Sequence, residues 1–406
     1  MITTINNEHK KVYVPNLRFP EFQGEWEKMR LDAFTERVMR KNKSNQSRLP
    51  LTISAQYGLV DQITFFNKVV ASTDLSNYYL LKKGEFAYNK SYSSDYPWGA
   101  IKRLDNYDQG ALSSLYICFA PQDNVVSDFI LQYFESPKWH KGISEIAVEG
   151  ARNHGLLNVA VQDFFHTYHY VPKDKKEQIK ISKLLMLLDE RISTQNKIIE
   201  DLKKLKSAIS KLLFAQMPNG WNRLDTLFSK GKAGGTPTST NKEYYNGEIP
   251  FLSINDITKQ GKYVRCTENY LSQSGLANSS AWVVPKYSLI MSMYASVGLV
   301  TINEMPLATS QAMFAMQLKD KNLLDYLYYY LSYFKYRHIH KYLETGTQSN
   351  INADIVRGIM IPTYGYRHNI EIASTLQGVD AKIDNELSVL EQLHRQKNYF
   401  LSQMFI

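Results

Sequence analysis

Two kinds of polar side chain in this sequence could act together, and the chemistry that they suggest is the binding of nucleic acid. Lys and Arg pair with phosphate groups, whereas Arg, Asn, Gln and Ser can hydrogen-bond to base edges in the major groove. In the first half of the chain the candidates are Asn89, Lys90, Ser91, Tyr92, Arg152, Asn153 and His154. In the second half they are Tyr294, Ser296, Thr347, Gln348, Ser349 and Asn350, with Lys232, Lys335, Arg337 and Lys341 as candidates for phosphate contacts. An ordinary polar loop is the alternative interpretation of any one of these residues.

Motifs that would give the chain catalytic chemistry of its own are missing from the sequence. Methyl transfer to a flipped base needs an Asn/Asp-Pro-Pro-aromatic loop, and the sequence has no Pro-Pro pair. A phosphate-binding loop reads Gly-x-x-x-x-Gly-Lys-Ser/Thr, whereas residues 231–236 read Gly-Lys-Ala-Gly-Gly-Thr. His338 and His340, like His166 and His169, lack a third ligand at usable spacing. We therefore expect no catalytic residue and no metal site in this chain.

The elements that must position the candidate residues are marked by an apolar repeat that the sequence contains twice. Apolar residues recur at alternating steps of three and four, the heptad pattern of a helix that lies along another helix. The first copy consists of Leu185, Leu188, Ile192, Ile199, Leu202, Ile209 and Leu213. The second copy consists of Leu376, Val379, Ile383, Leu390, Leu393, Phe400 and Met404. The polar interruptions also match, because Gln195 and Lys206 stand where Glu386 and Lys397 stand in the second copy. At roughly 1.5 Å per residue, each copy predicts a helix on the order of 55 Å long.

Between the two helices lie globular stretches whose short apolar runs, turns and one helical segment follow one plan. The predicted order is an arm at 1–24, a globular domain at 25–170, a helix at 171–217, a second domain at 218–361 and a final helix at 362–406. We expect an α+β protein with two globular α/β domains separated by two long helices. Those helices would pack as an antiparallel coiled coil, with a pseudo-two-fold repeat.

Composition narrows the class of protein. The chain has 406 residues and a formal net charge of +9, with a pI near 9.1, which favours an acidic partner such as nucleic acid. The two cysteines, Cys118 and Cys266, are too far apart for a metal or redox motif and fit a reducing compartment. The sequence contains no apolar run of the ~20 residues that span a bilayer. We expect a cytoplasmic protein with no membrane partner.

Three segments carry a resemblance to a known family. Asn16-Leu17-Arg18-Phe19-Pro20-Glu21-Phe22-Gln23-Gly24-Glu25-Trp26 resembles the leader of bacterial type I restriction–modification specificity subunits. The segment Gly234-Gly235-Thr236-Pro237, followed by residues 244–252, is similar to the opening of one of their target recognition domains, and residues 155–165 are similar to the exit from one. The resemblance covers nearly the whole chain. One departure is Tyr287, where the family usually has Gly and where the first repeat has Gly84.

This resemblance implies a subunit that recognises double-stranded DNA and has no catalytic activity. Each recognition domain would read one half of a bipartite target, and the helices would fix the unread spacer between the halves. The helices would also dock two methyltransferase subunits that carry S-adenosylmethionine, joined by translocating nuclease subunits that use ATP and Mg. The complex would direct adenine methylation or cleavage in bacterial defence. A non-catalytic scaffold that binds only protein partners is the alternative.

Overall fold

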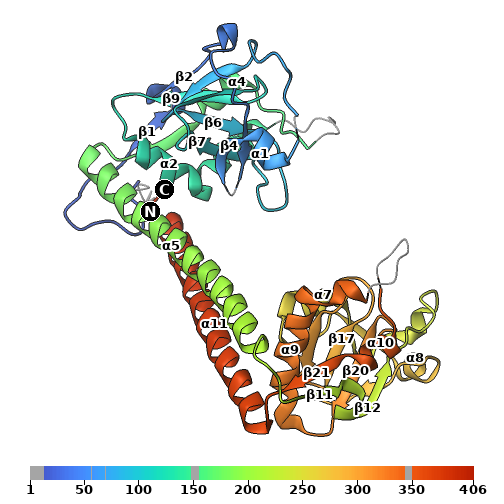
Figure 1. Ribbon diagram of the computed structural model, residues 1–406. Coiled ribbons are helices and arrows are strands. Elements are labelled where there is room, and N and C mark those ends of the chain that lie inside the picture. The colour runs from blue at the N-terminus through green and yellow to red at the C-terminus, as the bar shows by residue number, and fades with distance from the viewer. Residues whose placement is uncertain (1–12, 56, 69, 148–154, 343–349) are drawn as a thin grey trace, which may run out of the picture. The chain divides into compact units, whose positions relative to one another are not determined.

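The computed structural model describes residues 13–55, 57–68, 70–147, 155–342 and 350–406. Its contacts divide the chain into two compact units, Met1–Asn196 with Ser388–Ile406, and Lys197–Leu387. Each unit therefore combines one sheet-rich domain with part of each of two long helices, α5 (Lys175–Phe214) and α11 (Tyr366–Gln403) (Figure 1). The fold is α+β, as the sequence predicts.

The domain of the first unit is built on an antiparallel sheet with the strand order β2-β9-β6-β7. Its strands are β1 (Glu27–Arg30), β2 (Thr35–Arg37), β3 (Leu51–Ser54), β4 (Gly58–Asp61), β5 (Tyr79–Lys82), β6 (Phe86–Asn89), β7 (Ala100–Arg103), β8 (Gln109–Leu112), β9 (Ile117–Pro121) and β10 (Tyr168–Val171). Its helices are α1 (Gln62–Phe66), α2 (Ser127–Glu135), α3 (His140–Ile146) and α4 (Val161–His166). Along β6, Phe86 and Tyr88 enter one core while Ala87 enters another. Successive side chains of a strand point to opposite faces, so this sheet is covered on both sides.

The domain of the second unit repeats this plan with additions. Its five-stranded sheet has the order β12-β20-β17-β18-β14, so its first four strands take the places of β2, β9, β6 and β7. The strands are β11 (Gly220–Arg223), β12 (Phe228–Ala233), β13 (Tyr245–Leu252), β14 (Tyr263–Val264), β15 (Asn269–Leu271), β16 (Val283–Val284), β17 (Leu289–Ser292), β18 (Val300–Asn303), β19 (Leu307–Thr309), β20 (Met313–Leu318) and β21 (Met360–Thr363). The helices are α6 (Leu224–Leu227), α7 (Ile254–Gln260), α8 (Gln273–Ala277), α9 (Leu324–Arg337) and α10 (Ala353–Gly358). In each domain the first strand pairs antiparallel with the last, β1 with β10 and β11 with β21, immediately before a long helix begins.

The turn at Tyr287 has the same left-handed geometry as its counterpart at Gly84. Tyr287 has a φ of 62° and Gly84 a φ of 87°. The Tyr287 N–H donates to the Asn303 carbonyl, and the Gly84 N–H donates to the Leu104 carbonyl. Each acceptor lies at the end of the neighbouring strand hairpin. A tyrosine in this region carries a steric cost that glycine avoids. The departure from the family pattern therefore changes the residue and leaves the turn in place.

The two long helices pack antiparallel within each unit. In the first unit Asp189, early in α5, pairs with Lys397, late in α11; in the second, Lys206, late in α5, pairs with Asp380, early in α11. Seven of the predicted seam residues are buried: Leu185, Leu188, Ile199, Leu376, Ile383, Leu393 and Met404. The other seven are half-buried: Ile192, Leu202, Ile209, Leu213, Val379, Leu390 and Phe400. No helix in the described part of the chain is long and apolar enough to cross a membrane.

A phenylalanine near the end of each long helix enters an aromatic cluster of the adjoining domain. The Phe214 ring lies 5.4 Å from the ring of Tyr330 on α9, and the Phe405 ring lies 5.7 Å from the ring of Tyr133 on α2, measured between centroids. Tyr326, Tyr329 and Tyr330 are all at most 5% exposed. The tyrosine-rich face of α9 is thus a packing surface, and aromatic pairs of this kind add to the stabilisation from apolar burial.

The segment before β1 is attached to the start of α5 through Glu177, which is 1% exposed. The spacing of Asp174 and Glu177 predicts a capping box, in which each side chain accepts from a backbone N–H near the other residue. The prediction is right for Asp174 and wrong for Glu177. The Asp174 carboxylate does accept from the Lys176 N–H at 2.8 Å. The Glu177 carboxylate instead accepts from Arg18 Nε and Nη2, both at 2.7 Å, and from Trp26 Nε1 at 3.1 Å. A buried carboxylate needs a charged partner, and the guanidinium group provides one.

We predict that Glu177→Ala destabilises the first unit strongly, because it leaves the Arg18 guanidinium and the Trp26 N–H without their acceptor. Removal of one member of a buried pair costs about 3–5 kcal/mol, so the thermal midpoint should fall on the order of 10 °C. Glu200→Ala, on the exposed side of the same helix, is the matched control and should leave the midpoint nearly unchanged. Calorimetry of both variants checks this, and equal midpoints would contradict the assigned role of Glu177.

Candidate nucleic-acid interface

In the first domain, the segment Asn89–Tyr92 lies against the chain that follows residues 148–154. The Leu157 N–H donates to the Lys90 carbonyl at 2.9 Å, and the Tyr92 N–H donates to the Gly155 carbonyl at 3.0 Å. The Tyr92 side chain is 53% exposed, and the Ser91 side chain is exposed as well. The Asn89 side-chain oxygen accepts from the Ser91 N–H at 3.0 Å, which stiffens the segment. Arg152, Asn153 and His154 lie outside the described residues.

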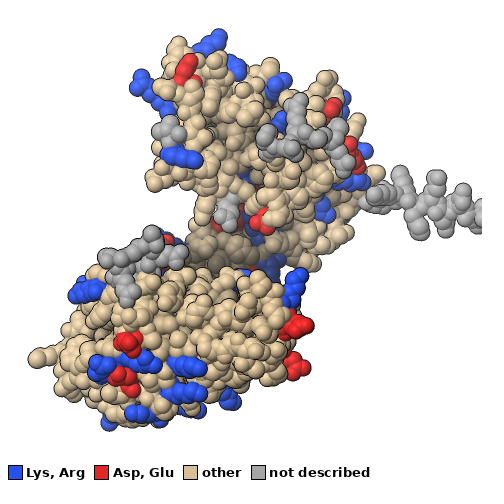
Figure 2. Space-filling view, turned by 90° about the vertical axis from the view of Figure 1, so that its right-hand side faces the viewer, with Lys and Arg blue, Asp and Glu red and all other residues tan. Residues whose placement is uncertain are grey.

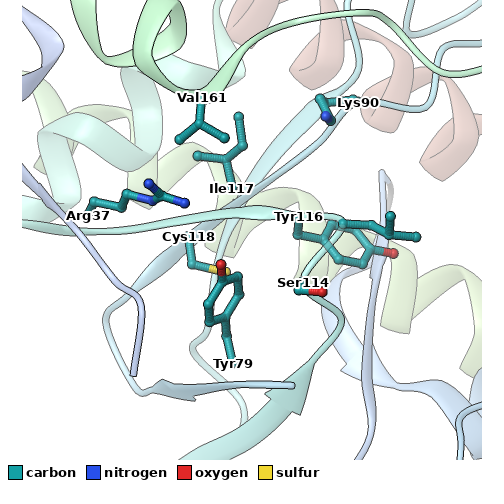
Figure 3. A pocket seen from close by; sticks show the side chains of 9 residues that line it. Arg37, Tyr79, Lys90, Ser114, Tyr116, Ile117, Cys118 and Val161 are labelled. Carbon is teal, nitrogen blue, oxygen red and sulfur yellow. The ribbon is translucent and has the colours of Figure 1, made fainter. Parts of the chain in front are cut away.

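Lys90 also lines a shallow hollow of about 140 Å³ on the first domain. Figure 3 shows Arg37 of β2 reaching in from one side and Lys90 lying on the other, with Ile117 between them and Tyr79, Ser114 and Cys118 lower in the view. Among the described residues neither Arg37 nor Lys90 has an ion-pair partner. Burial raises the pKa of the Cys118 thiol to about 12, so this thiol is neutral and weakly nucleophilic. Two unpaired cations beside hydroxyl groups are complementary to a phosphate group.

Arg37 is a candidate that reasoning from the sequence missed. It lies on β2, which has the same place in its sheet as β12, the strand that carries the predicted Lys232. The strand registers do not align these two residues, because Arg37 pairs with Phe119, whose counterpart Met316 pairs with Gly231. The distance along the chain between Arg37 and Lys90 concealed their proximity, because only the sheet brings β2 and β6 to either side of β9.

In the second domain, the loop after β17 is held in a defined conformation. The Ser292 hydroxyl donates to the Ser296 carbonyl at 2.8 Å and accepts from the Leu299 N–H at 2.9 Å. Ala295 and Ser296 have φ values of 41° and 55°, so the loop turns sharply and leaves the side chains of Tyr294 and Ser296 exposed. Such strain in a surface loop is typical of functional sites, where the surrounding structure maintains it.

The same loop is bound to the segment that begins at Asn350. The Ile351 N–H donates to the Met293 carbonyl at 3.1 Å, so half-buried Asn350 lies beside the Tyr294 loop. Thr347, Gln348 and Ser349 lie outside the described residues. The two domains therefore share one arrangement, in which the segment after β6 or β17 is hydrogen-bonded to the chain that follows the second predicted polar loop.

The predicted cations of the second domain lie on three elements. Lys335 of α9 is half-buried against the loop, where a Cβ on Gly298 would meet its Cγ at 3.2 Å, and burial lowers the pKa of its ammonium group. Arg337 and Lys341 are exposed at the end of α9 and in the following short helix (Ile339–Lys341), and Lys232 is exposed on β12. Figure 2 shows Lys and Arg mixed with Asp and Glu on a largely uncharged face.

Two of the histidines considered as metal ligands, His169 and His338, have surroundings that lower their pKa. His169 is buried, and its two ring nitrogens lie 2.9 Å from the Tyr133 hydroxyl and 2.8 Å from the Thr167 hydroxyl. Burial lowers the pKa of His169 to about 3, so the ring is neutral. The pKa of His338 is lowered by burial and by the nearby Lys341. The described residues contain no group of three potential ligands from His, Cys, Asp and Glu.

Close packing of the backbone explains why glycine stands at both Gly234 and Gly235. A Cβ on Gly234 would lie 1.9 Å from the Thr309 carbonyl oxygen, and one on Gly235 would lie 2.5 Å from the Ala281 nitrogen. The Gly234 N–H donates to the Met313 carbonyl at 3.0 Å, and the Gly235 N–H donates to the Thr309 carbonyl at 2.9 Å. Only glycine permits this close approach of backbones, which explains the residue types that open this motif.

The sequence matches one family model and is similar to several known proteins. Residues 218–395 match the family model of the type I restriction modification DNA specificity domain. The type I restriction enzyme MjaIX specificity subunit of Methanocaldococcus jannaschii is 26% identical over 178 residues, which are 41% of this chain and 40% of that protein. The HindI specificity subunit of Haemophilus influenzae is 32% identical over 114 residues, 28% of this chain and 24% of that protein. The chain thus matches less than half the length of each of these two relatives.

Two solved structures share the fold. One, from a study of complex assembly and conformational transition of the type I R-M system, has a TM-score of 0.60 at 17% identity and covers 94% of this chain and 97% of that one. The other, the S subunit of a type I restriction–modification system from M. genitalium, has a TM-score of 0.55 at 15% identity and covers 97% and 99%. At these identities the likeness concerns the fold alone. The matched domain and the relatives show that residues 218–395 are similar to the type I restriction modification DNA specificity domain, and that the chain is similar to type I restriction enzyme specificity subunits.

Proposed function

We propose that this chain reads a bipartite DNA target on behalf of a type I restriction–modification complex. The observation that carries the proposal is the arrangement shared by the two domains. In each, an exposed polar segment after β6 or β17 is hydrogen-bonded to the chain beyond the second polar loop. Each domain reads one half of the target, because each holds its own set of phosphate-binding and base-reading side chains.

The partners follow from this role. Two methyltransferase subunits with S-adenosylmethionine dock on the long helices, and translocating nuclease subunits that use ATP and Mg join them. The complex then directs adenine methylation or cleavage, and this chain contributes no catalytic residue. Exposed apolar side chains along α5, among them Leu187 at 51% and Leu205 at 50%, support a protein partner on the helices.

The experiment that tests the proposal is the mapping of methylated adenines genome-wide in cells with and without the gene. We expect a two-part motif with an unread spacer that disappears when the gene is deleted. A gel shift on random duplexes, with and without methyltransferase, distinguishes DNA reading from a scaffold that binds proteins only. No DNA retention with the partner present would favour the scaffold.

We predict that one heptad inserted into both long helices together lengthens the spacer. The insertion points are after Asn196 and after Leu387, where the two contact units meet in each helix. Seven residues add about 10 Å of helix, which corresponds to about three base pairs of duplex. Sequencing of the methylated motif measures the change. The same insertion in α5 alone is the control, because it breaks the seam and should abolish the motif; an unchanged spacer after the paired insertion contradicts the role of the helices.

We predict that Asn350→Ala and Lys335→Ala weaken binding in different ways. Asn350→Ala should relax specificity at one or two base pairs, at about 1–3 kcal/mol for a bidentate contact. Lys335→Ala should weaken all sequences alike and reduce the salt slope by about one unit, because it removes a phosphate contact. Lys321→Ala, in the short helix that precedes α9 (Lys321–Leu323), is the control and should change neither quantity. Binding titrations at several salt concentrations decide, and equal loss on every sequence after Asn350→Ala would remove that residue from the base-reading set.

A further inference from the structure

The helix pair contains two ion pairs that are equivalent in the repeat. Lys397 Nζ lies 2.5 Å from Asp189 Oδ1 in the first unit, and Lys206 Nζ lies 2.5 Å from Asp380 Oδ1 in the second. Lys206 and Lys397 are the matched polar interruptions of the apolar seam, and each aspartate directly follows a matched seam residue, Leu188 or Val379. The same pair has therefore been built twice, with the roles of α5 and α11 exchanged.

Each aspartate is also shared with the recognition domain of its own unit. The Gln132 side-chain amide of α2 donates to Asp189 Oδ2 at 2.9 Å, and the Tyr329 hydroxyl of α9 donates to Asp380 Oδ2 at 2.7 Å. Both donors are buried, with exposed fractions of 1% and 3%. Each group of three side chains thus joins one domain helix to both long helices; we name the Asp189–Lys397–Gln132 group the first node and the Asp380–Lys206–Tyr329 group the second node.

The second node has additional contacts to the domain. Lys262 donates to the Tyr329 hydroxyl at 3.0 Å and pairs with Asp325 of α9 at 2.7 Å. The other oxygen of Asp325 accepts from Gln377 of α11 at 2.6 Å. Tyr329 is therefore held from both sides, and this fixes the orientation of α9 on α11.

A polar group in an apolar seam selects one alignment of two helices. An apolar heptad seam is nearly self-similar, so a shift by one heptad brings apolar side chains back into contact. After such a shift Lys397, whose side chain is 15% exposed, would lose its carboxylate and leave a largely buried charge unpaired. The cost of an unpaired buried charge exceeds what the pair itself contributes, so the pair acts mainly against wrong alignments.

We infer that the two nodes set the register of α5 against α11 and seat each recognition domain on it, which makes their residues positioning residues for DNA reading. The inference rests on the proposed function where it concerns the DNA spacer. The register itself is a property of the protein alone. The nodes thereby determine which single spacer length the complex accepts.

Charge exchange tests the inference. Asp189→Lys with Lys206→Asp on α5 places like charges at both nodes, and Asp380→Lys with Lys397→Asp on α11 does the same. The four substitutions together restore opposite charges in inverted polarity. Gln132 and Tyr329 can serve the inverted pair, since an amide and a hydroxyl both donate and accept.

Each double variant should lower the thermal midpoint by on the order of 5 °C, and the fourfold variant should recover most of this loss. The control is Glu200→Lys with Lys204→Glu, an exposed pair on α5, which should change nothing.

The second measurement is the methylated motif from cells that express each variant with its partner subunits. The double variants should lose the motif or accept several spacer lengths, and the fourfold variant should regain one length. Unchanged midpoints in the double variants, no recovery in the fourfold variant, or a double variant that keeps one spacer length would each overturn the inference. If the wild-type complex methylates no split target, the proposed function fails. The thermal recovery still shows whether the charge pairs of the nodes hold α5 against α11.

Discussion

The apolar seam between α5 and α11 is the contact on which the rest of the structure depends. It contributes to both cores. The first unit cannot form its core from one continuous segment, whereas the second unit is the single segment Lys197–Leu387, which includes the first part of α11. Leu393, Met404 and Phe405, from the end of the chain, complete the core of the first unit, which begins with β1. Ile372 and Leu376 of α11 enter the core of the second unit with Phe214 of α5. Burial of these side chains therefore couples the ends of the sequence to its middle, and no unit is complete before α11 has docked.

On this shared frame the two domains keep their topology while their side chains differ. Positions that face the core of either domain stay apolar, because a close-packed interior tolerates little change in side-chain size or polarity. Phe86 on β6 and Leu289 on β17 illustrate this, since both are fully buried at matching places of the sheets. The exposed segments that follow these strands carry Lys90 and Tyr92 in one domain and Tyr294 and Ser296 in the other. Divergence in the loops costs the fold little and can change what each domain binds, which suits two readers with separate specificities.

The sequence predicted those features that depend on local periodicity. The fourteen seam positions and the correspondence of strands such as β6 and β17 follow from spacing alone, because the period of apolar residues reflects which face is buried. Features that depend on tertiary partners were not predictable. Glu177 has the spacing of a capping box, yet Arg18 and Trp26 take its carboxylate, since a distant guanidinium pairs more strongly than a neighbouring amide. The sheet of β15, β13, β19 and β16 was missed because three of its four strands are only two or three residues long. Arg37 was missed because the sheet alone brings it near Lys90.

A heptad seam by itself is a poor ruler, because it stabilises several alignments almost equally. This chain limits that degeneracy at both ends of each helix. A β-ribbon, β1 with β10 or β11 with β21, ends directly before each helix begins and so fixes the first turn against a domain. A phenylalanine, Phe214 or Phe405, enters an aromatic cluster where each helix ends, and a side chain of that size cannot be moved by one turn without leaving a cavity. Between these end points the charged groups act within the seam. Stability thus comes from the apolar stripe and alignment from its ends and its polar interruptions, and a spacer of defined length needs both.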